Sequence, residues 1–174
     1  MMSSSTTSAS SRGNGAVAGV DAVTGLPNGG LWHERVRHHV DQIPAADHAV
    51  LLVIDVDELQ VVNYAHGRAV GDLALAAVGS VLRARCHPVG VPGRTGDDEF
   101  VHLFTADRDV VPQLVQHMRD DLTGLIVPTK DAVVAVSATV GAAVSPRGRL
   151  DLTRLFWDAE TVLYAEKKLA PRAR

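Results

Sequence analysis

Acidic side chains gather at two places in this sequence where strands are expected to end. Asp55 and Asp57 follow directly after an unbroken apolar run, and residues 97–99 (Asp-Asp-Glu) form the turn between two strand-like segments. Carboxylates crowded at strand ends repel one another unless a cation relieves the repulsion. These hard oxygen donors, with no His or Cys beside them, favour Mg²⁺ or Mn²⁺ over zinc. Magnesium held by few carboxylates usually also binds phosphate, so the two clusters together indicate nucleotide chemistry. For Asp55 and Asp57 alone, solvated turn residues are the commoner interpretation.

The two acidic clusters meet only if their strands are neighbours. The apolar run at residues 49–54 has the length and branching of a strand buried on both faces. Segments 89–95 and 99–104 flank a Gly-Asp-Asp turn and predict a β-hairpin. A further strand is expected over 133–144, with Gly141 as a bulge. In a ferredoxin-like sheet the first strand and this hairpin lie side by side, which would bring the carboxylates together.

The helical spacing of apolar residues predicts four helices around these strands. The first starts after the capping residue Asn28 and ends at Pro44. The second has an apolar stripe made of Val70, Leu73, Ala74, Ala77, Val78, Val81 and Leu82. The third spans residues 111–122 and the last 152–163, and the loop at 127–131 has room for a further short strand. The core order is then β-α-β-β-α-β, so we expect an α+β fold with a ferredoxin-like core and an extra helix at each end.

The composition of the chain excludes several classes of protein. Its 174 residues, 46% of them hydrophobic, suit one globular domain with a core built mostly from Ala, Val and Leu. A net charge of −3 gives no basic footprint for nucleic acid, and no apolar run reaches the ~18 residues that a membrane span needs. The single cysteine, Cys86, excludes a disulfide framework and fits a reducing compartment, so we expect a cytoplasmic protein.

The chain divides into three parts by composition. Residues 1–20 are rich in Ser, Thr, Gly and Ala and predict a flexible leader. We expect residues 21–170 to form the single domain and residues 171–174 to form a short tail. This division would leave no room for a separate sensor domain.

Five segments of the chain, in order, resemble motifs of one family, the GGDEF domains of diguanylate cyclases. The segments are DAVTGLPN (21–28), LVIDVD (52–57), the spacing from Asn63 to Asp72 with Gly67 between them, RTGDDEF (94–100) and LYAEK (163–167). They look like the family's D-x-LTGLPN, D-x-D, N-x8-D, RYGGDEF and LYxAK motifs, and the resemblance extends over roughly residues 21–170. It implies a nucleotidyl-cyclase-type domain that joins two GTP molecules into cyclic di-GMP.

The resemblance implies roles for the residues at the acidic strand ends. Asp55, the backbone carbonyl of Val56 and Glu99 would hold Mg²⁺ or Mn²⁺ against the GTP phosphates. Asp98 stands where the family has an acidic residue implicated in metal binding or in deprotonating the 3′-hydroxyl. That hydroxyl would attack an α-phosphate and release pyrophosphate, with metal ions stabilising the charge. Each domain would hold one GTP, so the reaction would need a homodimer in which two domains face each other.

Four further positions would bind the nucleotide. Asn63 and Asp72 would read the guanine edge, because an amide and a carboxylate match its mixed donors and acceptors. Lys167 would reach a phosphate, and Gly96 would lie against the substrate as the first glycine of the signature. Plainer roles stay open for three of them. Asp72 is also a charge favoured near a helix N-terminus, Asn63 suits a turn, and Lys167 suits a solvated helix end.

The chain departs from the family pattern beside the expected phosphates. Asp97 replaces the second glycine of the signature and adds bulk and negative charge. A like charge at about 5 Å costs ~3 kcal/mol at an effective dielectric of about 20. Gln60 stands where the family has a phosphate-binding Lys, and Tyr64 and Arg68 replace its usual Asp and His. Residues 87–90 lack the R-x-x-D product-inhibition motif, so feedback through that site is not expected.

Three hypotheses remain open from the sequence. The chain is a weak diguanylate cyclase acting as a transient homodimer, a degenerate domain that holds GTP or a signalling partner protein without making product, or a dimerisation module that binds no nucleotide. The retained metal and guanine residues favour the first hypothesis, and Asp97 together with Gln60 favours the second.

Overall fold

The computed structural model describes residues 18–169 apart from 41–42, 44–46, 86–89 and 131. Its helices and strands are α1 (Gly29–Val40), β1 (His48–Val56), α2 (Leu59–His66), α3 (Arg68–Arg85), β2 (Val91–Arg94), β3 (Glu99–Ala106), α4 (Val111–Asp121), β4 (Leu125–Pro128), β5 (Val133–Val136), β6 (Ala138–Val144) and α5 (Leu152–Leu169). Most of the expected leader, the tail, Cys86 and residues 87–89 of the expected inhibition motif lie outside the described residues.

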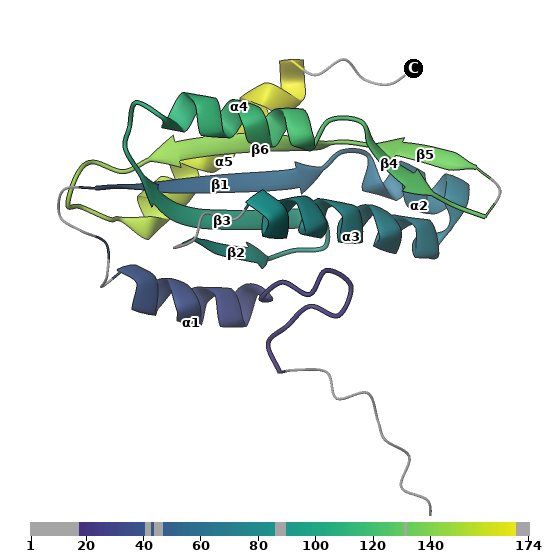
Figure 1. The fold of residues 1–174 in the computed structure, drawn as a ribbon, viewed down its shortest axis with the longest axis horizontal. Coiled ribbons are helices and arrows are strands. Elements are labelled where there is room, and N and C mark those ends of the chain that lie inside the picture. Colours follow the sequence, from purple (N-terminus) through teal and green to yellow (C-terminus); the bar gives the residue numbers. More distant parts are fainter. Residues whose placement is uncertain (1–17, 41–42, 44–46, 86–89, 131, 170–174) are drawn as a thin grey trace, which may run out of the picture.

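Four strands form one antiparallel sheet in the order β2-β3-β1-β6, while β4 and β5 form a separate two-stranded sheet. The first core strand therefore lies beside the central hairpin, as in a ferredoxin-like sheet, and the predicted α+β fold class is confirmed. Figure 1 shows α3 and α4 in front of the large sheet and α5 behind it. α1 packs on the same face as α5, in one shared apolar cluster.

Side chains of β1 point alternately to the two faces of the sheet, and both faces are buried. Leu52 and Ile54 belong to the core cluster of α3 and α4, whereas Leu51 and Val53 belong to the cluster of α1 and α5. Burial on both faces explains the unbroken apolar run in this strand. Asp55 continues the second series, so it lies on the α5 side of the sheet.

The segment between β1 and β2 holds two helices where one was predicted. Glu58, in a left-handed conformation (φ 52°), precedes the short helix α2, and Gly67 (φ 87°) separates it from α3. α3 begins at Arg68, and its buried face differs from the predicted stripe: Leu73 is 48% exposed whereas Leu75 is buried. The buried face differs because it includes Gly71 and Gly79, and glycines do not contribute to the apolar pattern from which the stripe was predicted.

The predicted strand over 133–144 is two strands in different sheets, so this expectation was wrong. β5 pairs with β4, β6 pairs with β1, and Ser137 lies between them. Gly141 is not a bulge, because the β1–β6 register runs unbroken through its pair with Val53. A Cβ on Gly141 would overlap the Ala159 carbonyl oxygen and lie 2.6 Å from the Leu163 nitrogen. Glycine is needed there for the close approach of α5.

The first helix and the central hairpin form where they were predicted. Asn28 caps α1, because its side-chain oxygen accepts a hydrogen bond from the Leu31 amide (3.1 Å). The described helix runs to Val40, and the predicted end at Pro44 lies outside the described residues. In the hairpin turn, the Thr95 amide donates to the Glu99 carbonyl (3.0 Å).

Both outer strands of the large sheet are covered by other parts of the chain. On β2, the Arg94 amide donates to the Pro27 carbonyl (2.8 Å). On β6, the Arg119 guanidinium of α4 donates to the Val140 carbonyl (3.2 Å) and to the Glu166 carboxylate of α5 (2.7 Å). These contacts use hydrogen-bonding groups that would otherwise stay open at the edges of the sheet.

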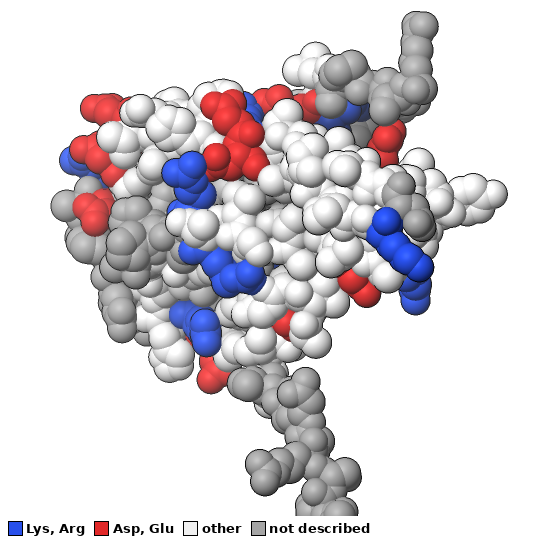
Figure 2. Space-filling model, turned by 45° about the vertical axis from the view of Figure 1, so that its right-hand side comes forward, with Lys and Arg blue, Asp and Glu red and all other residues white. Residues whose placement is uncertain are grey.

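Charged side chains form small separate groups on the face shown in Figure 2, with uncharged surface between them. Within the described part of the chain, none of the helices combines the length and the apolar composition that a membrane crossing requires.

Candidate functional site

The two acidic clusters meet at the end of the large sheet where β1 stops and β3 starts. In the β1–β3 ladder Asp55 is the direct partner of Glu99, and directly opposed residues share one face of a sheet. The Val56 amide donates to the Asp98 carbonyl (3.0 Å), which holds the hairpin turn against the end of β1. We call Asp55, Asp57, Asp98 and Glu99 the strand-end carboxylates. Their juxtaposition is the one that the strand order predicts.

Three of the strand-end carboxylates are contacted by other side chains. The contacts are the Lys167 ammonium with Asp55, the Thr139 hydroxyl with Asp57 (2.7 Å) and the Thr95 hydroxyl with Glu99. The ion pair is half-buried: the Asp55 side chain is 23% exposed and the Lys167 side chain 37%. The predicted phosphate-binding lysine thus lies at this site, with its charge directed at a carboxylate.

The pKa of Asp55 depends first on burial and then on the charges around the carboxyl group. Burial raises the pKa of Asp55, while the hydrogen bond and the charge of Lys167 lower it. The charges of Asp98 and Asp57 raise it again, so that the pKa lies above its ordinary value. Burial is the largest of these effects and disfavours the ionised carboxylate, so a cation bound at this end of the sheet would stabilise the ionised form of Asp55.

The chemistry of the donors fits Mg²⁺ or Mn²⁺. Asp55, Asp98 and Glu99 offer carboxylate oxygens and Val56 a backbone carbonyl, which are hard ligands of the kind that these ions prefer. Across the described residues, no three His, Cys, Asp or Glu side chains already converge in an arrangement that could hold a metal ion. The proposed donors therefore include a backbone carbonyl beside the carboxylates.

The two predicted guanine-binding residues lie on the helices that follow β1. Asn63 is on α2 and Asp72 is near the start of α3, and Figure 1 shows α2 and the start of α3 beyond the end of β1. A Cβ on Gly71 would overlap the Asn63 side-chain oxygen, so the amide rests against α3 beside Asp72. Asn63 is half-buried and Asp72 is exposed. The structure thus brings both residues to the end of the sheet that carries the strand-end carboxylates.

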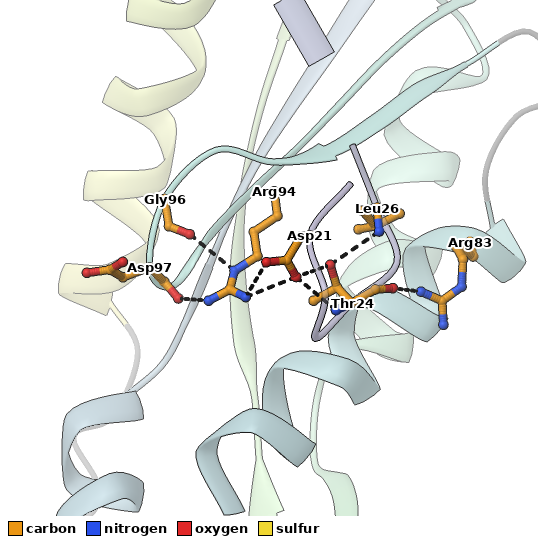
Figure 3. A network of polar contacts seen from close by, with 7 residues as sticks. All are labelled: Asp21, Thr24, Leu26, Arg83, Arg94, Gly96 and Asp97. Atoms are coloured by element: carbon orange, nitrogen blue, oxygen red, sulfur yellow. Dashed lines mark hydrogen bonds and ion pairs between the residues drawn. The ribbon is translucent and has the colours of Figure 1, made fainter. Parts of the chain in front are cut away.

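An arginine with no role assigned from the sequence ties the hairpin turn to the first motif (Figure 3). The Arg94 guanidinium donates to both Asp21 carboxylate oxygens (3.1 Å each) and to the carbonyls of Gly96 (3.2 Å) and Asp97 (2.7 Å). Asp21 also accepts hydrogen bonds from the Thr24 amide (2.8 Å) and hydroxyl (2.6 Å). We call these five residues the Arg94 clamp. The sequence gives one signal for this contact: Asp21 and Arg94, which have opposite charges, are the first residues of two motifs that lie 73 residues apart.

The clamp also sets the ionisation of Asp21. Partial burial raises the pKa of this carboxyl, but the hydrogen bonds from Thr24 and Arg94 and the Arg94 charge outweigh burial. The pKa of Asp21 therefore lies below its ordinary value, and the ion pair persists through the neutral pH range.

Comparison with known proteins decides the family. The chain matches the family described as "Diguanylate cyclase, GGDEF domain" over residues 18–172. It belongs to the GGDEF family. The family resemblance read from the five motifs is confirmed, and the GGDEF domains of cyclic di-GMP signalling proteins are its relatives.

Two curated relatives illustrate how the GGDEF similarity is distributed. An uncharacterized 19.3 kDa protein in the repSA 5′ region of Streptomyces ambofaciens is 43% identical over 90 residues, which are 52% of this chain and 46% of that protein. The cyclic di-GMP phosphodiesterase PdeR of Escherichia coli K12 is 29% identical over 156 residues, which are 87% of this chain and 23% of PdeR. The matched part spans less than half the length of either relative.

Solved GGDEF structures share the fold of this chain. The GGDEF domain of DgcB from Caulobacter crescentus, solved in complex with c-di-GMP, has a TM-score of 0.79 at 22% identity, covering 89% of this chain and 93% of that one. A sensory box/GGDEF family protein from Caulobacter crescentus has a TM-score of 0.78 at 24% identity, covering 88% of this chain and 100% of that one. At these identities the similarity establishes the fold.

The residues that depart from the GGDEF pattern lie on the surface. Asp97 is exposed, and Figure 3 shows its carboxylate directed away from the Arg94 guanidinium. Gln60 at the start of α2 and Arg68 at the start of α3 are exposed, and Tyr64 is 95% exposed. These substitutions therefore change the charge and shape of the surface and leave the core of the GGDEF fold intact.

Proposed function

We propose that this GGDEF domain binds GTP together with Mg²⁺ or Mn²⁺ at the strand-end carboxylates, and that two copies facing each other form cyclic di-GMP slowly. The observation that carries the proposal is the pairing of Asp55 with Glu99 beside the Asp98 turn. The proposal takes residues 21–170 as the domain, the cytoplasm as its compartment and a homodimer as its active form.

The guanine base would be recognised by Asn63 and Asp72. The exposed Asp72 carboxylate can accept hydrogen bonds from the ring and exocyclic N–H groups of guanine, and the Asn63 amide can donate to its carbonyl. Adenine lacks both the ring N–H donor and the carbonyl acceptor at those positions. The pair therefore supports GTP over ATP as the nucleotide.

The reaction proposed is the attack of the 3′-hydroxyl of one GTP on the α-phosphate of the other, with pyrophosphate leaving. A bound divalent cation would neutralise charge on the phosphates. Asp98, at the hairpin turn, would accept the hydroxyl proton, and Lys167 would bind a phosphate as a point charge. Because each copy holds one GTP, the attacking and the receiving nucleotides belong to different copies.

A second candidate is a GTP-binding module without turnover. It is favoured by the exposed Asp97 carboxylate in the signature turn and by the neutral Gln60 on α2. Compared with the family pattern, the protein then has one more negative charge and one fewer positive charge near the expected phosphates. Such a module would act through a signalling partner protein.

The test is to incubate the purified chain at high concentration with GTP and Mg²⁺ or Mn²⁺, and to measure cyclic di-GMP by chromatography and GTP binding by calorimetry. We expect slow product formation. GTP binding with no product would replace the cyclase proposal by the second candidate. No GTP binding at all would refute both and leave a dimerisation module.

The departures can be tested on the same assays. Asp97→Gly combined with Gln60→Lys should raise GTP affinity by at least about tenfold, because it removes one like charge and restores one opposite charge near the phosphates. An unchanged affinity would show that these two positions do not weaken nucleotide binding.

A further inference from the structure

The Lys167 ammonium occupies the carboxylate that the proposed function assigns to the metal. Lys167 lies near the C-terminal end of α5, and its ammonium contacts the Asp55 Oδ1 oxygen at the end of β1. α5 reaches this position because it packs closely over Gly141 of β6, the strand next to β1. The contact is thus built into the packing of the last helix on the sheet.

We infer that Lys167 is the counter-ion of Asp55 before ligands bind: it contacts Asp55 until metal and triphosphate arrive together, and it then transfers its contact from the carboxylate to a phosphate. This inference rests on the proposed function. It adds a coupling between metal and nucleotide that the separate roles of the residues do not contain.

Exchange is required because a divalent cation and the Lys167 ammonium cannot both lie against the same Asp55 oxygen. Their positive charges would repel at contact distance, and a magnesium ligand must direct its oxygen at the metal. Lys167 has the freedom to move away, since its side chain is 37% exposed and carries its charge on a flexible four-carbon stem. Asp55, which is 23% exposed, would stay in place.

Among the described residues, three other cations near α5 and the hairpin turn are engaged elsewhere. Lys168 lies over the Tyr164 ring, 4.2 Å from its centroid, Arg119 pairs with Glu166 and Arg94 pairs with Asp21. In the described part of the chain, no second Lys, Arg or His forms an ion pair with a strand-end carboxylate. Lys167 is therefore the cation whose position decides whether Asp55 is open to a metal.

Two consequences follow for binding. Metal alone must break the ion pair and leaves Lys167 without a partner, so it binds weakly. Metal with triphosphate gives the released ammonium new oxygen ligands, so each ligand strengthens the other. By linkage the strengthening is equal in both directions, and couplings between sites in proteins are on the order of 5–150-fold.

The experiment measures Mn²⁺ affinity by electron paramagnetic resonance, with and without a GTP analogue whose α–β bridge is carbon. The analogue should raise Mn²⁺ affinity by a certain factor in each protein. We expect this factor to be at least about fivefold larger in wild type than in Lys167→Met. Without the analogue, Lys167→Met should bind Mn²⁺ more tightly than wild type. Lys168→Met is the matched control. It removes the same charge from the neighbouring residue, whose side chain lies over the Tyr164 ring and does not contact Asp55 in an ion pair. It should behave as wild type.

Each outcome separates the two proposals. If Lys167→Met and Lys168→Met have the same Mn²⁺ affinity while the analogue still binds, the counter-ion inference is wrong and the proposed function stands. If Mn²⁺ and the analogue fail to bind in wild type in any combination, the proposed function is wrong and the inference is refuted with it. If Lys167→Met does not fold, Lys167→Gln takes its place. The wild-type titration also tests the inference by itself, because a Mn²⁺ affinity that the analogue leaves unchanged would overturn it.

Discussion

Arg94→Lys tests whether the Arg94 clamp depends on the shape of the guanidinium or only on its charge. The planar group donates in three directions, to the Asp21 carboxylate and to the carbonyls of Gly96 and Asp97. A lysine ammonium keeps the positive charge but cannot reproduce this fixed fork of donors. We therefore expect the substituted side chain to keep its contact with Asp21 and to lose both carbonyls of the turn.

The expected loss of stability follows from those two hydrogen bonds. Each one contributes about 0.5–1.5 kcal/mol net. The residues that carry the carbonyls are exposed, so water replaces the lost donor, and the pair should cost ~2 kcal/mol. In a domain of this size ~1 kcal/mol lowers Tm by about 2–4 °C, so Arg94→Lys should melt about 4–8 °C below wild type. Arg94→Ala should lose more, because Asp21, whose side chain is 22% exposed, then also loses its counter-charge.

Thermal and urea unfolding followed by circular dichroism measure this loss. Arg85→Lys is the matched control, because Arg85 is 57% exposed and, among the described residues, its guanidinium contacts the Asp121 carboxylate; it should lose less than about 1 kcal/mol. The turn leads directly into Glu99, so Arg94→Lys should also weaken the joint binding of Mn²⁺ and a GTP analogue. Equal melting temperatures for the two variants would refute the reasoning, as would a double-mutant cycle with Asp21→Asn that shows no coupling.

Three further perturbations test other parts of the structure. Gly141→Ala should cost about 1–3 kcal/mol, because the new Cβ would overlap the backbone of α5; wild-type stability in urea would show that α5 can shift without cost. Gly71→Ala should displace the Asn63 amide and lower GTP affinity at least about tenfold by calorimetry, and an unchanged affinity would contradict the guanine role of Asn63. The pKa of Asp21 is lowered in the fold, so its stabilising contribution is present above the unfolded pKa of about 3.9 and is lost as pH falls through the folded pKa. Asp21→Asn should therefore flatten the fall in unfolding free energy below about pH 4, and parallel curves for variant and wild type would contradict this.

The meeting of the strand-end carboxylates was predictable because it needs only the order of the elements. A long apolar run ending in acids and a hairpin with an acidic turn leave few ways to place the strands. The register then follows from burial: a slip by one residue would turn Leu51 and Val53 away from the α1 and α5 layer. Asp55 and Glu99 become partners as a result.

Other features depend on contacts that a local pattern does not encode. α2 has eight residues and buries only Leu59 among its described side chains, so its periodicity is too short to register. Ser137 is one polar residue in an apolar run, yet it separates two sheets. The sequence places Lys167 near a helix end. Its ion pair with Asp55, however, depends on which face of the sheet α5 covers. The contact of Arg94 with Asp21 spans 73 residues and has no local signature.

The covered edges of the large sheet have a consequence for how copies of this chain can assemble. A strand from another copy that approached β6 would meet the Arg119 guanidinium, already bound to the Val140 carbonyl. On the opposite side it would meet the chain at Pro27, already bound to β2. These contacts occupy part of each edge and hinder growth of the large sheet from copy to copy, the route by which strand-rich proteins form fibrils and precipitates.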